Sequence, residues 1–203
     1  MARKRVAILI SGRGSNMAAL IAAAKAADYA AKIALVIASR PDAAGLVIAT
    51  SEGIPTATVT ARSFADKASF EAAIDRELAE ARIELICLAG FMRVLSAAFV
   101  ERWHDRIINI HPSLLPAFPG VKAQSQALHH GVKVAGCTVH FVDAGLDSGA
   151  IIAQATVPVL DDDTEESLQA RILVEEHRLL PAVVADLAAG RVRREGRRVF
   201  RAT

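Results

Sequence analysis

Two polar side chains end an apolar stretch near the middle of this 203-residue chain. Asn109 and His111 follow Ile107-Ile108, and Pro112 and Pro116 then restrict the backbone that leaves. In a strand, residues two apart point to the same face, so we expect the Asn109 amide and the His111 imidazole to lie side by side. A hydrogen-bond donor beside a titratable ring is what a reaction through an oxyanion requires.

Two further polar blocks flank this one. Ser11-Gly12-Arg13-Gly14-Ser15-Asn16 lies upstream, and Gly136 to Asp143 followed by Ala144-Gly145-Leu146-Asp147-Ser148-Gly149 lies downstream. In this order and spacing the blocks resemble the glycinamide ribonucleotide formyltransferase family, folate-dependent enzymes of purine synthesis. The resemblance runs from about Val6 to about Gly190. It implies transfer of the formyl group of 10-formyltetrahydrofolate to the amine of glycinamide ribonucleotide.

The resemblance assigns catalysis to Asn109, His111 and Asp147. Asn109 and His111 would stabilise the oxyanion of the tetrahedral intermediate. Asp147 would favour the protonated form of His111, because an adjacent negative charge stabilises an imidazolium.

The resemblance also assigns positions to the two substrates. The ribonucleotide would contact Gly14, Ser15 and Asn16 through its phosphate, and Glu176 elsewhere. Folate would lie between two walls, formed by Met92, Arg93, Val94 and Leu95 and by Asp143, Ala144, Gly145 and Leu146. Lys67 stands where the family often has an arginine near the folate tail, and Gln124 stands where it usually has a histidine.

The glycine-rich block also has an interpretation from its residues alone. It joins an apolar strand to a helix, and the free N–H groups of a helix N-terminus suit a phosphate. The block does not complete the dinucleotide-binding pattern G-x-G-x-x-G, because Met17 occupies the third glycine position. It does not complete the P-loop pattern either, because the Walker lysine is missing. A plain turn with a helix cap therefore remains an alternative.

The other histidines lack a comparable arrangement in the sequence. No Cys or His cluster has the spacing of a zinc site, so we expect no catalytic metal. We place outside the catalytic cluster His104, His129, His130, His140 and His177.

Apolar strands alternate with amphipathic helices as far as His111. This alternation predicts an α/β fold, a Rossmann-like, mostly parallel sheet with helices on both faces. Residues 134–142 and 150–157 are expected to form an antiparallel strand pair, because the loop between them is too short for a parallel crossover. We expect Ser69, Ser96 and Asp163 or Thr164 to cap helices. One formyltransferase domain, 1–203, is predicted, with a phosphate- or nucleotide-binding half (about 1–108) and a catalytic and folate-binding half (about 109–203).

Composition indicates a folded globular protein, with 53% hydrophobic and 23% charged residues. No apolar run approaches the ~20 residues that span a bilayer. Cys87 and Cys137 lie in apolar runs, which indicates reduced thiols and a cytoplasmic location. Six arginines fall between Arg191 and Arg201. A hairpin turning at 195–196 is favoured there over a nucleic-acid surface, because interleaved aromatic residues are missing.

Three alternatives belong to other classes of protein. Methionyl-tRNA formyltransferase would need a further C-terminal domain, and formyltetrahydrofolate hydrolase a further N-terminal domain; we expect this chain to have neither. A folate- or nucleotide-binding protein without catalysis is disfavoured by the presence of Asn109, His111 and Asp147. The expected partners are the two small-molecule substrates, with no nucleic acid and no membrane, and the expected state is a monomer or a homodimer.

Overall fold

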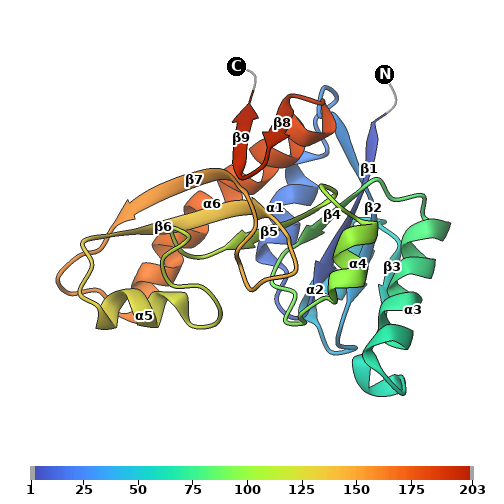
Figure 1. Cartoon of the computed structure of the whole chain (residues 1–203), viewed down its shortest axis with the longest axis horizontal. Helices are drawn as coiled ribbons and strands as arrows, with labels where there is room; N and C mark the ends of the chain where they lie inside the picture. The colour runs from blue at the N-terminus through green and yellow to red at the C-terminus, as the bar shows by residue number, and fades with distance from the viewer. Residues whose placement is uncertain (1–2, 202–203) are drawn as a thin grey trace.

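The computed structural model describes residues 3–201, and its centre is a seven-stranded sheet (Figure 1). The strand order is β3-β2-β1-β4-β5-β6-β7. The strands are β1 (Lys4–Ile10), β2 (Ala31–Ala38), β3 (Thr56–Thr58), β4 (Leu85–Leu88), β5 (Ile107–His111), β6 (Val134–Phe141) and β7 (Ile151–Pro158). Neighbouring strands from β3 to β5 are parallel, whereas β6 is antiparallel to both β5 and β7. The predicted fold class and the antiparallel pair are therefore confirmed.

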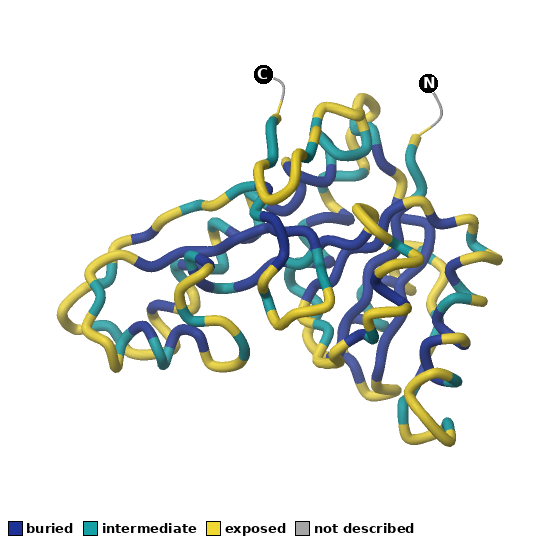
Figure 2. Tube along the Cα trace, viewed as in Figure 1, coloured by how far each residue is buried: buried dark blue, intermediate teal, exposed yellow. Residues whose placement is uncertain are grey.

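Helices cover both faces of this sheet. They are α1 (Ser15–Ala23), α2 (Ala44–Ser51), α3 (Lys67–Glu80), α4 (Ala97–Arg102), α5 (Ala123–His129) and α6 (Glu165–Ala188), with a 3-10 turn η1 (Ala61–Ser63). Strand β1 shows how the sequence builds two layers, because alternate side chains point to opposite faces. Val6 and Ile8 pack in one apolar cluster with α1 and α6, whereas Ala7 and Leu9 pack in another with α3 and α4. Figure 2 shows the resulting buried sheet between exposed helix surfaces.

Three helices, α3, α4 and α6, start at a side-chain cap. Thr164 caps α6 and Ser96 caps α4, as the sequence predicts. The expectation that Ser69 caps α3 was wrong. Asp66 is the cap, and its Oδ1 accepts a hydrogen bond from the Ser69 N–H at 2.7 Å. Ser69 occupies the third helical position, where its hydroxyl completes a reciprocal capping box.

The C-terminal arginines lie on or beside a hairpin of β8 (Val192–Glu195) and β9 (Arg198–Arg201), which confirms the predicted hairpin, although the turn is at residues 196–197 instead of 195–196. Both cysteines are buried free thiols, and burial raises the pKa of Cys87 to about 12. Within residues 3–201, no helix is long and apolar enough to cross a membrane.

Candidate active site

A cavity of about 820 Å³ lies at the carboxyl ends of β1, β4 and β5. This is the edge where parallel α/β sheets bind their ligands. Hydrogen bonds join the strand ends there: the Ser11 N–H donates to the Gly90 carbonyl at 3.0 Å, and the Met92 N–H donates to Ser11 Oγ at 2.8 Å. The loop after β6, the segment 120–124 and side chains of α6 also line the cavity.

Asn109 and His111 both line this cavity, because they stand two residues apart on β5. His111 is buried, and each of its ring nitrogens faces an acceptor. Its Nε2 lies 2.9 Å from the Phe118 carbonyl oxygen, and its Nδ1 lies 3.4 Å from Asp147 Oδ2. Both ring nitrogens therefore have a neighbour that can accept a hydrogen bond.

Asp147 reaches the cluster from the loop after β6. Its backbone has a φ of 50°, an unusual conformation for a residue with a side chain. Its Oδ2 also accepts a hydrogen bond from the Gly120 N–H at 2.8 Å, which links this loop to the proline-rich segment after His111. The side chain is only 13% exposed, so its charge is weakly screened by solvent.

His140 belongs to this cluster, and the expectation that it lies outside was wrong. Antiparallel pairing of β5 with β6 places His140 directly opposite Asn109. Its Nδ1 lies 2.8 Å from the Phe141 carbonyl and therefore carries the proton, so Nε2 can accept from the Asn109 amide nitrogen at 3.2 Å. Burial lowers the pKa of His140, which favours this neutral form. The second amide hydrogen of Asn109 stays available to a ligand.

The glycine-rich turn lies at another part of the same cavity. Gly14 has a φ of 75°, and an added Cβ would lie 2.9 Å from the Gly45 Cα. Its lack of a side chain lets the start of α1 approach α2 closely. The N-cap of α1 has no side-chain hydrogen bond, so the first N–H groups of the helix are not capped by a side chain.

Asn16 and Glu176 meet beside this turn, although 160 residues separate them. The Asn16 amide nitrogen donates to Glu176 Oε2 at 2.7 Å, while Asn16 Oδ1 is buried without a hydrogen-bond partner among the described residues. Burial raises the pKa of Glu176, opposed by this hydrogen bond. A buried acceptor without a partner and a buried carboxyl group are the features of a polar ligand site.

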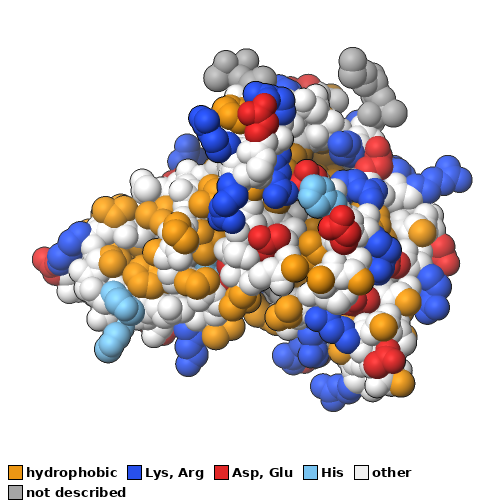
Figure 3. All heavy atoms as spheres, in the orientation of Figure 1, with side chains coloured by type: hydrophobic (Ala, Val, Ile, Leu, Met, Phe, Trp, Pro, Cys, Tyr) orange, Lys and Arg blue, Asp and Glu red, His pale blue; other side chains and the backbone are white. Residues whose placement is uncertain are grey.

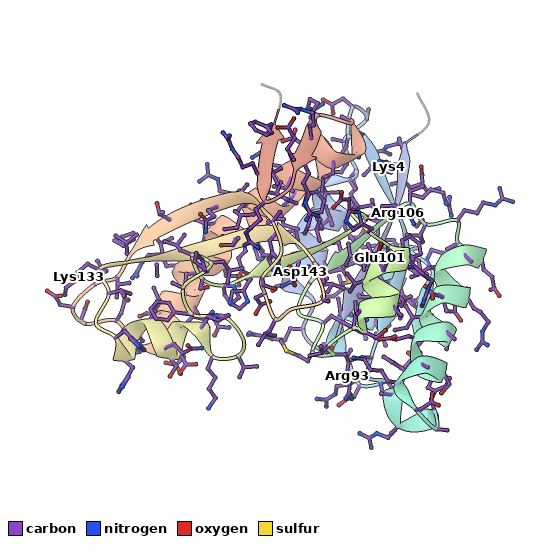
Figure 4. All side chains as sticks on the ribbon, in the orientation of Figure 1. Lys4, Arg93, Glu101, Arg106, Lys133 and Asp143 are labelled. Carbon is purple, nitrogen blue, oxygen red and sulfur yellow. The ribbon has the colours of Figure 1, made fainter. Side chains whose placement is uncertain are left out.

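The remaining wall of the cavity is apolar at its mouth. Met92, Val94 and Leu146 are 70%, 69% and 62% exposed, yet all three line the cavity. Exposed apolar groups rimmed by polar ones typically mark a ligand site. Figure 4 labels Arg93 and Asp143, on the segments that follow β4 and β6.

Two of the predicted folate contacts lie outside the lining. Lys67 is exposed at the first position of α3, and Ala144 is exposed within the loop after β6. Their roles stay predictions. The sequence alone did not single out several residues that do line the cavity, among them Lys122, Gln169 and Leu173. Gln124 lines it too and is almost completely buried. Among residues 3–201, no group of three or more His, Cys, Asp or Glu side chains could hold a metal ion.

The fold and the site define a class: a Rossmann-like α/β protein whose cavity contains a glycine-rich helix start without a side-chain cap and an Asn-His-Asp cluster suited to an oxyanion. Comparison with known proteins then gives the family. Residues 4–184 match the family described as Formyl transferase, and the chain belongs to this family.

Three relatives illustrate the similarity. Glycinamide ribonucleotide transformylase 1 from Symbiobacterium toebii has a solved structure with a TM-score of 0.96 and 46% identity, covering 99% of this chain and 95% of that one. Phosphoribosylglycinamide formyltransferase of Bacillus subtilis (strain 168) is 42% identical over 184 residues, which are 91% of this chain and 94% of that protein. Trifunctional purine biosynthetic protein adenosine-3 of Drosophila melanogaster is 53% identical over 190 residues, which cover 93% of this chain. The chain spans only 14% of the length of that relative.

Proposed function

We propose that this protein transfers the formyl group of 10-formyltetrahydrofolate to the amine of glycinamide ribonucleotide, a step of purine synthesis. One observation carries the proposal: Asn109, His111 and Asp147 converge in a single cavity with the glycine-rich turn at residues 11–16. The Bacillus subtilis and Symbiobacterium toebii relatives, whose names state this activity, support it along nearly their whole length.

The ribonucleotide is assigned to the end of the cavity beside α1. Its phosphate would accept from the N–H groups of Gly14, Ser15 and Asn16, where the helix dipole favours an anion. The unpartnered Asn16 Oδ1 and the Glu176 carboxyl group would accept from donors elsewhere on this substrate.

Folate is assigned to the end with the exposed apolar residues. A flat, partly apolar ring system fits between the segments 92–95 and 143–146, where Met92, Val94 and Leu146 offer apolar surface. Lys67 lies outside the cavity, at the start of α3, and we assign it only to the charged tail of this substrate. The formyl donor supplies the electrophilic carbon, which must lie near Asn109 and His111.

In the reaction, the unprotonated amine attacks the formyl carbon. A carbon–nitrogen bond forms, and the carbonyl electron pair moves to oxygen. The second hydrogen of the Asn109 amide and an N–H of His111 would donate to this oxyanion. The bond to the folate nitrogen then breaks as that nitrogen gains a proton, and the attacking nitrogen loses one. His111 is the group we assign to this proton exchange.

Two contacts set conditions on this chemistry. The His111 Nε2–H donates to the Phe118 carbonyl, so this hydrogen bond must be exchanged for one to the substrate. Asp147 faces the other ring nitrogen and would stabilise the charged ring while the oxyanion is present.

The test is a spectrophotometric assay with 10-formyltetrahydrofolate and glycinamide ribonucleotide, run in parallel without the acceptor. We expect folate conversion that requires the ribonucleotide. Conversion without it would instead identify a hydrolase. Folate binding with no conversion under either condition would identify a binding protein, and either result would overturn the proposal.

A further inference from the structure

The C-terminal hairpin packs against the catalytic half of the molecule. Strand β9 lies beside β7, and Val192 and Val199 join the apolar cluster beneath the hairpin. In Figure 1 the hairpin follows α6 and lies above the strands β5 to β7. It is therefore a packed element of the fold.

Ion pairs fix the hairpin at both ends. Arg191 and Arg201 both pair with Asp186 near the end of α6. Arg194 pairs with Asp105, which lies just before β5. The Arg194 Nε also donates to the Gly196 carbonyl in the hairpin turn at 2.7 Å. Arg194 thus connects the hairpin turn to the segment that leads into β5.

The next residue of this turn reaches the loop that carries Asp147. Arg197 Nη1 donates to the Ser148 carbonyl at 3.0 Å. Ser148 follows Asp147 directly, and its Oγ donates to Asp143 Oδ1 at 2.7 Å. The Gly145 N–H donates to the same carboxylate oxygen at 3.1 Å. The loop therefore has an internal support, Asp143, and two external ones, the Gly120 N–H and Arg197.

We infer that Arg197 is a positioning residue for the proposed formyl transfer. It holds the loop between Asp143 and Gly149, so that Asp147 stays against His111 and the loop keeps its place as a folate wall. This inference rests on the proposed function, but its structural part, the restraint of the loop by the hairpin, is measurable without activity.

The chemistry of the contact defines a matched set of variants. A single carbonyl needs one N–H donor, which lysine supplies and methionine does not. Arg197→Met therefore removes the hydrogen bond while keeping a long side chain, and Arg197→Lys restores a donor. Arg198 is the control, because this neighbouring arginine stacks on the Phe200 ring at 5.1 Å. Figure 3 shows basic side chains gathered around the hairpin.

The first measurement is steady-state kinetics with each substrate varied. For Arg197→Met we expect a rise in KM for the formyl donor of about three- to tenfold, as loss of one exposed charged hydrogen bond predicts, together with a lower kcat, because Asp147 is then less firmly held against His111. The KM for the ribonucleotide should stay unchanged, because its assigned site lies at α1 and α6. Arg197→Lys should restore most of the loss, and Arg198→Met should behave as the wild type.

The second measurement is hydrogen exchange on the same proteins without substrates. Arg197→Met should speed exchange of the amides in residues 143–149 and of the Gly120 amide, which donates to Asp147. Unchanged exchange in this variant overturns the inference, whatever the kinetics show. If wild-type protein has no transferase activity, the proposed function fails, and exchange alone decides whether the hairpin restrains the loop. Equal effects of Arg197→Met and Arg197→Lys on these measurements would also contradict the inference about Arg197.

Discussion

Replacing Asp147 with asparagine isolates the effect of its charge. The amide oxygen of asparagine can still accept from the Gly120 N–H, so the loop should keep its place. The lost interaction is the one with a protonated His111, across 3.4 Å. At an effective dielectric constant of about 20, two unit charges at that distance attract by about 5 kcal/mol.

Part of this attraction offsets the desolvation of two nearly buried groups. We therefore expect a net loss of about 3–4 kcal/mol, which lowers kcat about 10²- to 10³-fold. The KM values should change little, because the lost interaction acts on the transition state.

The assay is initial-rate kinetics of folate conversion, with circular dichroism and thermal unfolding to verify the fold. Asp161→Asn is the matched control, since Asp161 is 92% exposed and pairs with Lys133 on the surface. A folded Asp147→Asn protein whose kcat lies within about fivefold of wild type, equal to about 1 kcal/mol, would refute the role of the charge.

Three other predictions follow from the site. Asn109→Ala and His111→Ala should each lower turnover by about 10²–10³, the usual effect of losing an oxyanion donor; near-normal turnover of either folded variant would remove it from the catalytic cluster. Glu176→Gln should stabilise the substrate-free protein above pH 4.5, because burial raises the pKa of Glu176 and the stability it contributes is lost as pH rises through the folded-state value. Thermal unfolding between pH 4 and pH 8 checks this, and a variant with the same pH dependence as wild type contradicts it. Gln124→His should raise turnover if the usual histidine assists proton transfer, and unchanged kcat dismisses that idea.

Local sequence patterns were sufficient for much of the fold. Uniformly apolar runs such as residues 6–10 form buried parallel strands, and Thr164 starts its helix as expected, because these features depend on neighbours in sequence. The start of α3 was misplaced because Asp66 and Ser69 are both good caps and act as one reciprocal pair.

The site was only partly predictable for a different reason. Asn109 and His111 stand on one strand, so their proximity follows from strand geometry. His140 joins them only through the β5–β6 pairing, which brings together residues 31 positions apart and leaves no local signal. The Phe118 carbonyl, which His111 contacts, belongs to a residue with a φ of 54°, a backbone conformation that its residue type does not indicate.

The hydrogen bond between Asn16 and Glu176 also bears on how the protein is made. It joins the first helix to the last, and Tyr29 likewise donates to the Pro181 carbonyl at 2.7 Å. A chain emerging from the ribosome therefore completes β1 to β7 before α6 can close this end of the cavity. Contacts of such large sequence separation form slowly, and intermediates that lack them expose apolar surface. While α6 is still inside the ribosome, we expect the apolar face that this helix covers to stay exposed and available to chaperones. The ribonucleotide end of the cavity should be the last part of the enzyme to form.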